Sequence, residues 1–342
     1  MDGVAVRDAG FRGRLFEETG SQMNLDPLIV EKDFWVCWTL QHLFNLPNLQ
    51  EHLIFRGGTT LSKVYGVIHR FSEDIGLTLN REFFGFRGEE DPANIMSTKQ
   101  RDRSINRMID TCRQYVKSGL QLQLEEIFAS KLKISDDLWE LVIDEQDEEE
   151  QTLLFFYPKS VKPASGFYVD PTVKLEFGSR ADTWPTNKAM VKPYAAEFFP
   201  DVFENNRECE VIALTAERTF WEKATILHQE ANRPAEKRFK TRYFRHYYDL
   251  AMMAQSPLLN KAIRNYDILE AVARHKKLFF RCGWARYDEA KPGTLRLCPP
   301  DFRLPELQKD FNNMQIMIFG DSQSFKEIMD ILSELESTIN SR

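Results

Sequence analysis

Two adjacent glycines, Gly57 and Gly58, placed between short apolar runs, constrain the fold of this chain more than any other feature. The run before them, 53–55, has the composition of a strand end. After them, apolar side chains recur at helical spacing: Leu61, Val64, Tyr65 and Ile68. Glycine lets a backbone approach a bound group closely, and free N–H groups at a helix start favour an anion such as a triphosphate. We therefore predict a phosphate-binding turn, with Thr59, Thr60 and Lys63 as further nucleotide contacts.

Two later segments alternate apolar and polar side chains, as strands with one buried face do. In the segment 74–79, Asp74 and Gly76 share the face opposite the apolar residues. In the segment 172–178, Lys174 and Glu176 share the corresponding face. If the two strands are neighbours, Glu176 lies where a metal-binding carboxylate is needed near Asp74. The structural alternative is that Glu176 is a surface residue of a half-buried strand.

The glycine turn and the acidic strand resemble the glycine-turn plus Asp-x-Asp signature of the DNA polymerase beta nucleotidyltransferase superfamily. The run FRGGTTLSKVYGVIHRFSEDI is more closely similar to the AbiEii/AbiGii nucleotidyltransferase toxins of abortive-infection toxin–antitoxin systems. The runs YVDPTVKLEFGSR and RHYYDL continue this resemblance, which covers roughly residues 28–340. It implies an α+β fold, with a nucleotidyltransferase-type mixed sheet flanked by helices and a C-terminal helical region.

The resemblance also implies a function and a set of site residues. It implies transfer of NMP from an NTP to RNA, such as a tRNA 3′ end, or to protein, with a cognate antitoxin as partner. Two Mg²⁺ ions are expected, with Asp74 and Glu176 as metal ligands and Lys223 and Asp249 as further catalytic residues. In that family the second residue of the acidic pair is Asp, whereas this chain has Gly76. We therefore expect an impaired enzyme, either a naturally degenerate copy or, as we favour, a detoxified variant.

The segment 233–249 is the most basic of the chain, and aromatic residues interleave with its charges. This composition suits contacts to RNA phosphates and base stacking. The candidate RNA-binding residues are Lys237, Arg238, Lys240, Arg242 and Arg245. The aromatics could equally form the packing face of a helix. Lys223, on the inward-facing stripe of a predicted helix, needs an anion, for which a nucleotide phosphate and Asp249 are the two alternatives.

Three other charged segments allow simpler interpretations. We interpret Glu31, Lys32 and Asp33, within a helix predicted over 28–44 after the cap Asp26-Pro27, as a solvated helix face. The basic start of a helix predicted over 98–131 is either a phosphate contact or, slightly favoured, a solvated surface. The acidic run 144–150 is predicted to be an exposed hairpin tip, and 181–210 to be a connector between domains.

The whole chain sets broader limits. Its 342 residues allow two domains, predicted as 1–210 and 211–342. The net charge of −7 disfavours uniform attraction to nucleic acid but permits a local basic patch. Five widely spaced cysteines and the absence of a long apolar run predict a soluble cytoplasmic protein with no membrane association. The competing hypotheses are a catalytically inactive protein that binds a nucleotide, RNA or an antitoxin, and, more weakly, a kinase.

Overall fold

The computed structural model describes residues 1–133, 138–162, 172–204, 206–320 and 323–341, and the chain forms two compact units. The first unit is Met1–Val64 with Ser72–Ala213, and the second is Tyr65–Phe71 with Leu214–Arg342. The domain boundary predicted at residue 210 falls inside a strand and is corrected to 213/214. The prediction also assigned Tyr65–Phe71 to the first domain, whereas this segment belongs to the second unit. Residues 168–171, the start of the YVDPTVKLEFGSR run, lie outside the described residues.

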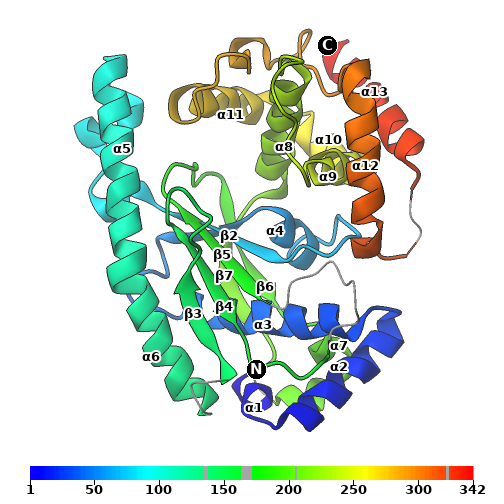
Figure 1. Ribbon diagram of the computed structural model, residues 1–342. Helices are drawn as coiled ribbons and strands as arrows, with labels where there is room; N and C mark the ends of the chain where they lie inside the picture. The colour runs from blue at the N-terminus through cyan, green and yellow to red at the C-terminus, as the bar shows by residue number, and fades with distance from the viewer. Residues whose placement is uncertain (134–137, 163–171, 205, 321–322, 342) are drawn as a thin grey trace. The chain divides into compact units, whose positions relative to one another are not determined.

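The first unit is built on a mixed seven-stranded sheet with the order β3-β4-β5-β2-β1-β7-β6 (Figure 1). The strands are β1 Leu53–Arg56, β2 Asp74–Leu79, β3 Glu140–Ile143, β4 Thr152–Phe156, β5 Val173–Gly178, β6 Thr186–Val191 and β7 Cys209–Leu214. Strand β2 pairs antiparallel to β1 and parallel to β5. The segment 181–210 is therefore not only a connector, because it contributes β6 and the start of β7 to the sheet.

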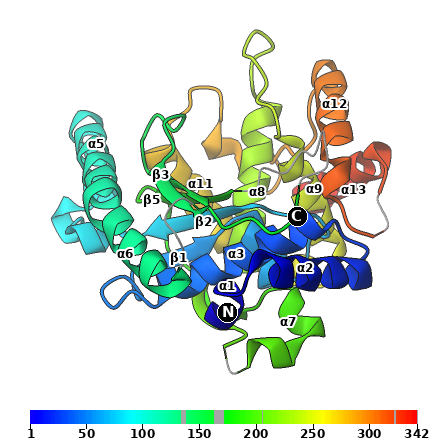
Figure 2. The same cartoon turned by 60° about the horizontal axis from the view of Figure 1, so that its bottom comes forward.

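Helix α3, Pro27–Phe44, lies across one face of the sheet (Figures 1 and 2). It begins as predicted, with Asp26 accepting a hydrogen bond from the Leu28 N–H at 2.8 Å and with proline in the first turn. Trp35 and Trp38 project from it onto Phe155 of β4, with ring centroids 5.9 and 5.8 Å apart. Burial of these large rings holds α3 against the sheet.

The charges on α3 are not a solvated face, and that prediction was wrong. Glu31, Lys32 and Asp33 are all buried. The Lys32 ammonium donates to Glu73 at 2.9 Å, and Asp33 accepts from Lys63 at 2.6 Å. A charge can be buried when it is paired and hydrogen-bonded, so each of these side chains ties α3 to a distant segment.

The remaining helices of the first unit are α1 Asp2–Ala5, α2 Ala9–Met23, α4 Gly58–Lys63, α5 Thr98–Tyr115, α6 Gln121–Leu132 and α7 Ala195–Phe198. A π-helical segment, Val116–Leu120, joins α5 to α6, so the predicted 98–131 helix is one long helix with a π-helical interruption. Short 3-10 turns lie at Arg81–Phe84, Gly88–Glu90, Pro92–Asn94 and Pro200–Phe203. Strands β3 and β4 form the predicted hairpin, but Asp144 at its tip is buried rather than exposed.

The second unit is helical. Its helices are α8 Ala216–Ala231, α9 Phe244–Gln255, α10 Leu258–Ala262, α11 Tyr266–Phe279, α12 Leu304–Met314 and α13 Phe325–Asn340, with 3-10 turns at Tyr287–Glu289, Asp301–Arg303 and Gln315–Met317. Within this unit the segment Tyr65–Phe71 pairs with the stretch after α12. The Phe71 N–H donates to the Met317 carbonyl oxygen, and the Phe319 N–H to that of His69, both at 2.7 Å.

Helix α4 ends at Lys63, before the predicted Val64, Tyr65 and Ile68. Gly66 follows with a φ of +59°, a left-handed conformation that ends a right-handed helix.

Among the described residues, no helix has the length and the apolar character needed to cross a membrane.

Candidate functional site

The predicted glycine turn is present between β1 and α4. Gly57 has a φ of +90°, and a Cβ built on it would meet no atom within 4 Å, so the backbone conformation rather than crowding requires glycine. Helix α4 begins at Gly58, and the first N–H groups of a helix lack intrahelical acceptors. Arg56, the residue before the turn, is paired with Gly76 of β2. The turn therefore opens at the end of β1 that adjoins the acidic strand.

The side chains of Thr59, Thr60 and Lys63 support this turn from within the first unit. Thr59 does not cap the helix: its hydroxyl donates to the Asp74 carbonyl oxygen at 2.5 Å and lies 3.0 Å from the Ser72 hydroxyl. Thr60 is fully buried. Both side chains are therefore buried inside the first unit, and contact of Thr59 and Thr60 with a nucleotide stays a prediction.

Lys63 is also directed inward. Its ammonium lies 2.6 Å from Asp33 and 3.8 Å above the ring centre of Tyr194. Burial alone would lower the pKa of Lys63, but Asp33 raises it above its ordinary value, so the side chain is cationic and satisfied. Lys63 therefore joins α4 to α3 and is removed from the predicted nucleotide contacts.

The acidic strand and the Glu176 strand are neighbours, as the prediction required. In the parallel β2–β5 pair, Asp74 is opposite Lys174 and Gly76 is opposite Glu176. The alternate residues Ile75, Leu77, Val173 and Leu175 are buried in the core. Asp74, Gly76, Lys174 and Glu176 consequently share the open face of the sheet, which we call the carboxylate face.

The backbone at Gly76 is closely approached by β1. A Cβ built on Gly76 would lie 2.9 Å from the carbonyl oxygen of Arg56, its partner in the antiparallel β1–β2 pair. Side-chain Cβ atoms essentially never lie this close to a backbone oxygen, so any side chain at position 76 requires a shift of β1 or β2. The carboxylate that the family signature places here would need the same shift.

The carboxylate face offers few metal ligands. No group of three or more His, Cys, Asp or Glu residues is arranged to hold a metal ion in the described part of the chain. Mg²⁺ is commonly held by one or two protein carboxylates, with phosphates and water completing its shell. Asp74 and Glu176 are therefore two candidate Mg²⁺ ligands on one face, and with Gly76 opposite Glu176 in the register they are fewer carboxylates than the three expected for a two-ion site.

Lys174, which the sequence did not single out, lies among these carboxylates. Its ammonium is 3.1 Å from Asp144 and 3.9 Å from Glu176. Burial alone would lower the pKa of Lys174, but the hydrogen bond to Asp144 and the charges of Glu176 and Asp74 raise it. A lysine is thus held in its charged form on the carboxylate face.

In the second unit, Lys223 of α8 and Asp249 of α9 are brought together. The Lys223 ammonium donates to Asp249 Oδ2 at 2.7 Å, so the ion pair, one of the two alternatives for Lys223, is observed. Arg70 completes the group: its Nε and Nη2 donate to the two oxygens of Asp249 at 2.7 and 2.8 Å. The Lys223 ammonium also lies 3.1 Å from Nδ1 of His246.

Burial and the cations of this group together shift the pKa values of its members. Burial alone would raise the pKa of Asp249, but Arg70 and Lys223 lower it to about 2. Burial and the nearby cations lower the pKa of His246 well below its ordinary value, so the ring is neutral and accepts from Lys223. Burial lowers the pKa of Lys223, and Arg70 adds to this effect while Asp249 opposes it.

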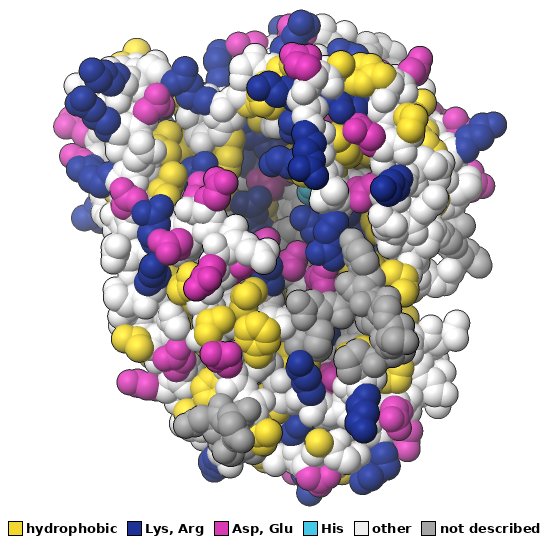
Figure 3. Space-filling model, viewed as in Figure 1, with side chains coloured by type: hydrophobic (Ala, Val, Ile, Leu, Met, Phe, Trp, Pro, Cys, Tyr) yellow, Lys and Arg dark blue, Asp and Glu magenta, His cyan; other side chains and the backbone are white. Residues whose placement is uncertain are grey.

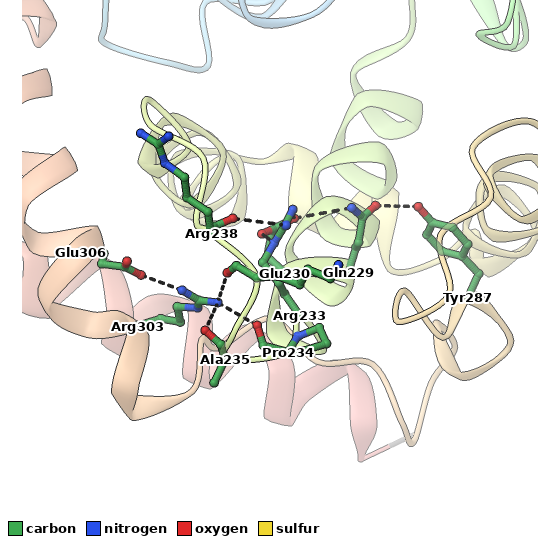
Figure 4. A network of polar contacts seen from close by, with 10 residues as sticks. Gln229, Glu230, Arg233, Pro234, Ala235, Arg238, Tyr287, Arg303 and Glu306 are labelled. Carbon is green, nitrogen blue, oxygen red and sulfur yellow. Dashed lines mark hydrogen bonds and ion pairs between the residues drawn. The ribbon is translucent and has the colours of Figure 1, made fainter.

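The predicted RNA-binding residues lie mostly on an ordered turn, residues 234–242, which we call the basic loop. Lys237, Arg238, Lys240 and Arg242 are exposed on it, and Arg245 is half-buried on α9. The buried guanidinium of Arg303 donates to the carbonyl oxygens of Pro234, Ala235 and Lys237 at 2.9, 3.3 and 2.6 Å (Figure 4). Asp310 accepts from the Arg242 and Phe244 N–H groups at 2.8 and 2.7 Å.

The aromatic residues of this region are mainly packing residues. Phe244, Tyr247 and Tyr248 are buried in the second unit, and Tyr243 is half-buried. The base-stacking interpretation is therefore corrected for the three buried side chains, which form the packing face of a helix as the alternative stated. The basic loop can contact phosphates, but it does not present a row of exposed rings.

Sequence reasoning missed Arg70, Lys174 and Arg303. Arg70 lies in a segment without periodicity, and Lys174 looked like an ordinary polar residue of a half-buried strand. Arg303 lies near Pro300 and Pro305, where the sequence indicates only a loop. For Arg70, the available signal was the need of a buried Asp249 for a second cation.

The chain resembles known nucleotidyltransferase toxins. A family model described as "Nucleotidyl transferase AbiEii toxin, Type IV TA system" matches residues 38–332. No curated protein matches the chain. Among solved structures, MenT4, nucleotidyltransferase toxin Rv2826c from Mycobacterium tuberculosis H37Rv, is similar over 97% of this chain and 96% of its own, with 12% sequence identity and a TM-score of 0.37.

Proposed function

Because the chain belongs to the nucleotidyl transferase AbiEii toxin family of type IV toxin–antitoxin systems, we propose that it transfers NMP from an NTP to RNA, such as a tRNA 3′ end. The observation that carries the proposal is the parallel pairing of β2 with β5, which puts Asp74 and Glu176 on one face beside the glycine turn. A cognate antitoxin is the proposed protein partner, and the cytoplasm the proposed location. Protein is the second candidate acceptor.

In the proposed reaction, an RNA hydroxyl forms a bond to the α-phosphorus, the bond to the bridging oxygen breaks, and pyrophosphate leaves with the electron pair while the hydroxyl proton passes to water. The backbone N–H groups after Gly57 hold the triphosphate. Asp74 and Glu176 would hold Mg²⁺, which when bound neutralises charge on the phosphates. We also propose that Lys223 and Asp249 belong to the catalytic set, supported by the family resemblance and by their buried ion group.

Gly76 is proposed to attenuate the activity. Loss of a ligand carboxylate removes charge that water does not replace, and about 1.4 kcal/mol of lost transition-state stabilisation is a tenfold loss in rate. Gly76 has two possible origins, a degenerate copy and a detoxified variant. The Arg56 carbonyl oxygen lies so close to Gly76 that the backbone at this position suits glycine. This close approach supports a degenerate copy over a detoxified variant that differs at one position.

The test is incorporation of label from α-labelled NTPs into RNA by the wild-type protein and by Gly76→Asp. We expect Gly76→Asp to raise incorporation by about tenfold or more, and to lower the melting temperature because β1 must shift. Gly76→Ala is the matched control, since it introduces the same Cβ without a carboxylate. It should lower the melting temperature and leave incorporation unchanged. A folded Gly76→Asp protein that labels neither RNA nor protein would refute the proposal.

The alternative function is a protein that binds a nucleotide, RNA or antitoxin without catalysis. The specific observation in its favour is the small donor set of the carboxylate face. Its signature is a nucleotide affinity that is the same in the wild-type protein and in Gly76→Asp, with no pyrophosphate released by either. Product analysis also separates a kinase, which would release nucleoside diphosphate.

A further inference from the structure

Lys174 is one of the four residues of the carboxylate face. It lies opposite Asp74 in the β2–β5 register, and Glu176 follows on the same face of the same strand. Its side chain is 35% exposed, whereas that of Asp144, its nearest acidic partner, is only 9% exposed. The Lys174 ammonium is therefore held in place by a largely buried carboxylate.

Asp144 is itself held in place. Its Oδ1 accepts from the Gln146 N–H at 3.0 Å, and its own N–H donates to the Thr152 carbonyl oxygen at 2.9 Å. The remaining oxygen, Oδ2, faces Lys174 at 3.1 Å. Asp144 thus anchors the ammonium next to Glu176, the more distant partner at 3.9 Å. A lysine held this way differs from a solvated surface lysine such as Lys188 of β6, which is 71% exposed.

We propose that Lys174 is a resident cation of the carboxylate face, which takes the place of one of the two metal ions and limits the face to a single divalent ion. The inference rests on the proposed function only in assuming that the bound ion takes part in nucleotidyl transfer. The observation that carries it is the disagreement between a two-ion site and this donor set, with a cation on the residue opposite Asp74. Lys174 acts through Asp74 and Glu176 and is therefore a positioning residue.

The experiment measures Mn²⁺ binding to the full chain by calorimetry, without NTP or RNA. Lys174→Met keeps the apolar stem of the side chain and removes its charge. We expect it to bind Mn²⁺ about tenfold more tightly than wild type, the effect expected from removing a like charge a few ångströms away in a partly hydrated site. Lys174→Arg keeps the charge and should bind like wild type. Lys188→Met, a strand lysine paired with Glu210, is the matched control and should also change nothing.

Unchanged or weaker Mn²⁺ binding by Lys174→Met would overturn the inference and leave Lys174 as the structural partner of Asp144. Absence of Mn²⁺ binding in both proteins would overturn it as well, because removal of the charge then exposes no site. Failure of the proposed function has a different signature. In that case, Lys174→Met gains Mn²⁺ affinity while no variant incorporates NMP.

Discussion

At the scale of single residues, the clearest feature is Asp249, whose two oxygens are shared by Arg70 and Lys223 inside the second unit. A buried carboxylate is stable only when such partners offset the loss of water. The same geometry makes the two cations depend on Asp249. Removal of its charge leaves both of them without this partner in a buried environment.

We therefore expect Asp249→Asn to lower the free energy of unfolding by about 3–5 kcal/mol near neutral pH. The pKa of Asp249 lies near 2, below its ordinary value of 3.8, so its stabilising effect is complete above pH 3.8 and is lost as the pH falls through 2. The penalty of the variant should accordingly shrink by about 2 kcal/mol between these limits. Denaturant unfolding at several pH values measures this change. Asp330→Asn, which replaces an exposed carboxylate of α13, is the control and should leave the free energy of unfolding near neutral pH almost unchanged. A penalty for Asp249→Asn that is constant with pH would contradict the argument.

At the scale of elements, the basic loop is shaped by a residue outside it. Arg303 satisfies three carbonyl oxygens of the loop, and its Nη1 also donates to Glu306 at 2.9 Å (Figure 4). The neighbouring Arg233 forms two hydrogen bonds to Glu230, at 2.6 and 2.8 Å. Buried guanidinium groups thus support the exposed ones, because carbonyl oxygens removed from water need donors.

Arg303→Met should loosen the basic loop without unfolding the second unit. The three carbonyl groups would lose their donor while the apolar stem of the side chain remains. Trypsin cleaves after Lys and Arg, so cleavage at Lys237, Arg238 and Lys240 should accelerate several-fold. Arg296→Met is the matched control, since Arg296 is exposed and bonds to Asn232 outside the loop. Equal cleavage rates in both variants and in wild type would show that Arg303 does not order the loop.

Elements with strong local patterns were predictable. The alternation around Asp74 and around Glu176 located β2 and β5, and Asp26-Pro27 located the start of α3. Contacts between distant segments were not predictable, because a local pattern holds no information about them. Lys32 is buried only because Glu73 reaches it, and Lys63 turns inward only because Asp33 is there. The position of β1 inside the sheet was also not predictable. One of its two neighbours is β7, and β7 begins in the segment 181–210, which we predicted to be a connector.

At the scale of the whole molecule, charge limits how RNA is bound. The net charge is −7, and Figure 3 shows Lys and Arg side chains interspersed with Asp and Glu side chains over the visible face. Long-range attraction to RNA should therefore be weak, and binding should depend on a few local contacts.

We expect a salt dependence that reflects the basic loop alone. Four phosphate contacts to single-stranded RNA would give a slope of log K against log salt concentration of about −3. Replacing Lys237 or Lys240 by Ala should each reduce the magnitude of the slope by about 0.7, measured by fluorescence anisotropy. Lys261→Ala, an exposed lysine of α10, should leave it unchanged. A slope that all three substitutions leave unchanged would place RNA binding elsewhere.

The short segment Tyr65–Phe71 is synthesised long before the residues that it contacts in the second unit. It leaves the ribosome early, yet its hydrogen-bond partners Met317 and Phe319, and Asp249 for Arg70, are made much later. These contacts are therefore not complete until residue 319 has emerged. A truncated or nicked polypeptide ending at residue 210 would contain the glycine turn and the acidic strand, but its Arg70 would lack the carboxylate that it binds in the complete protein.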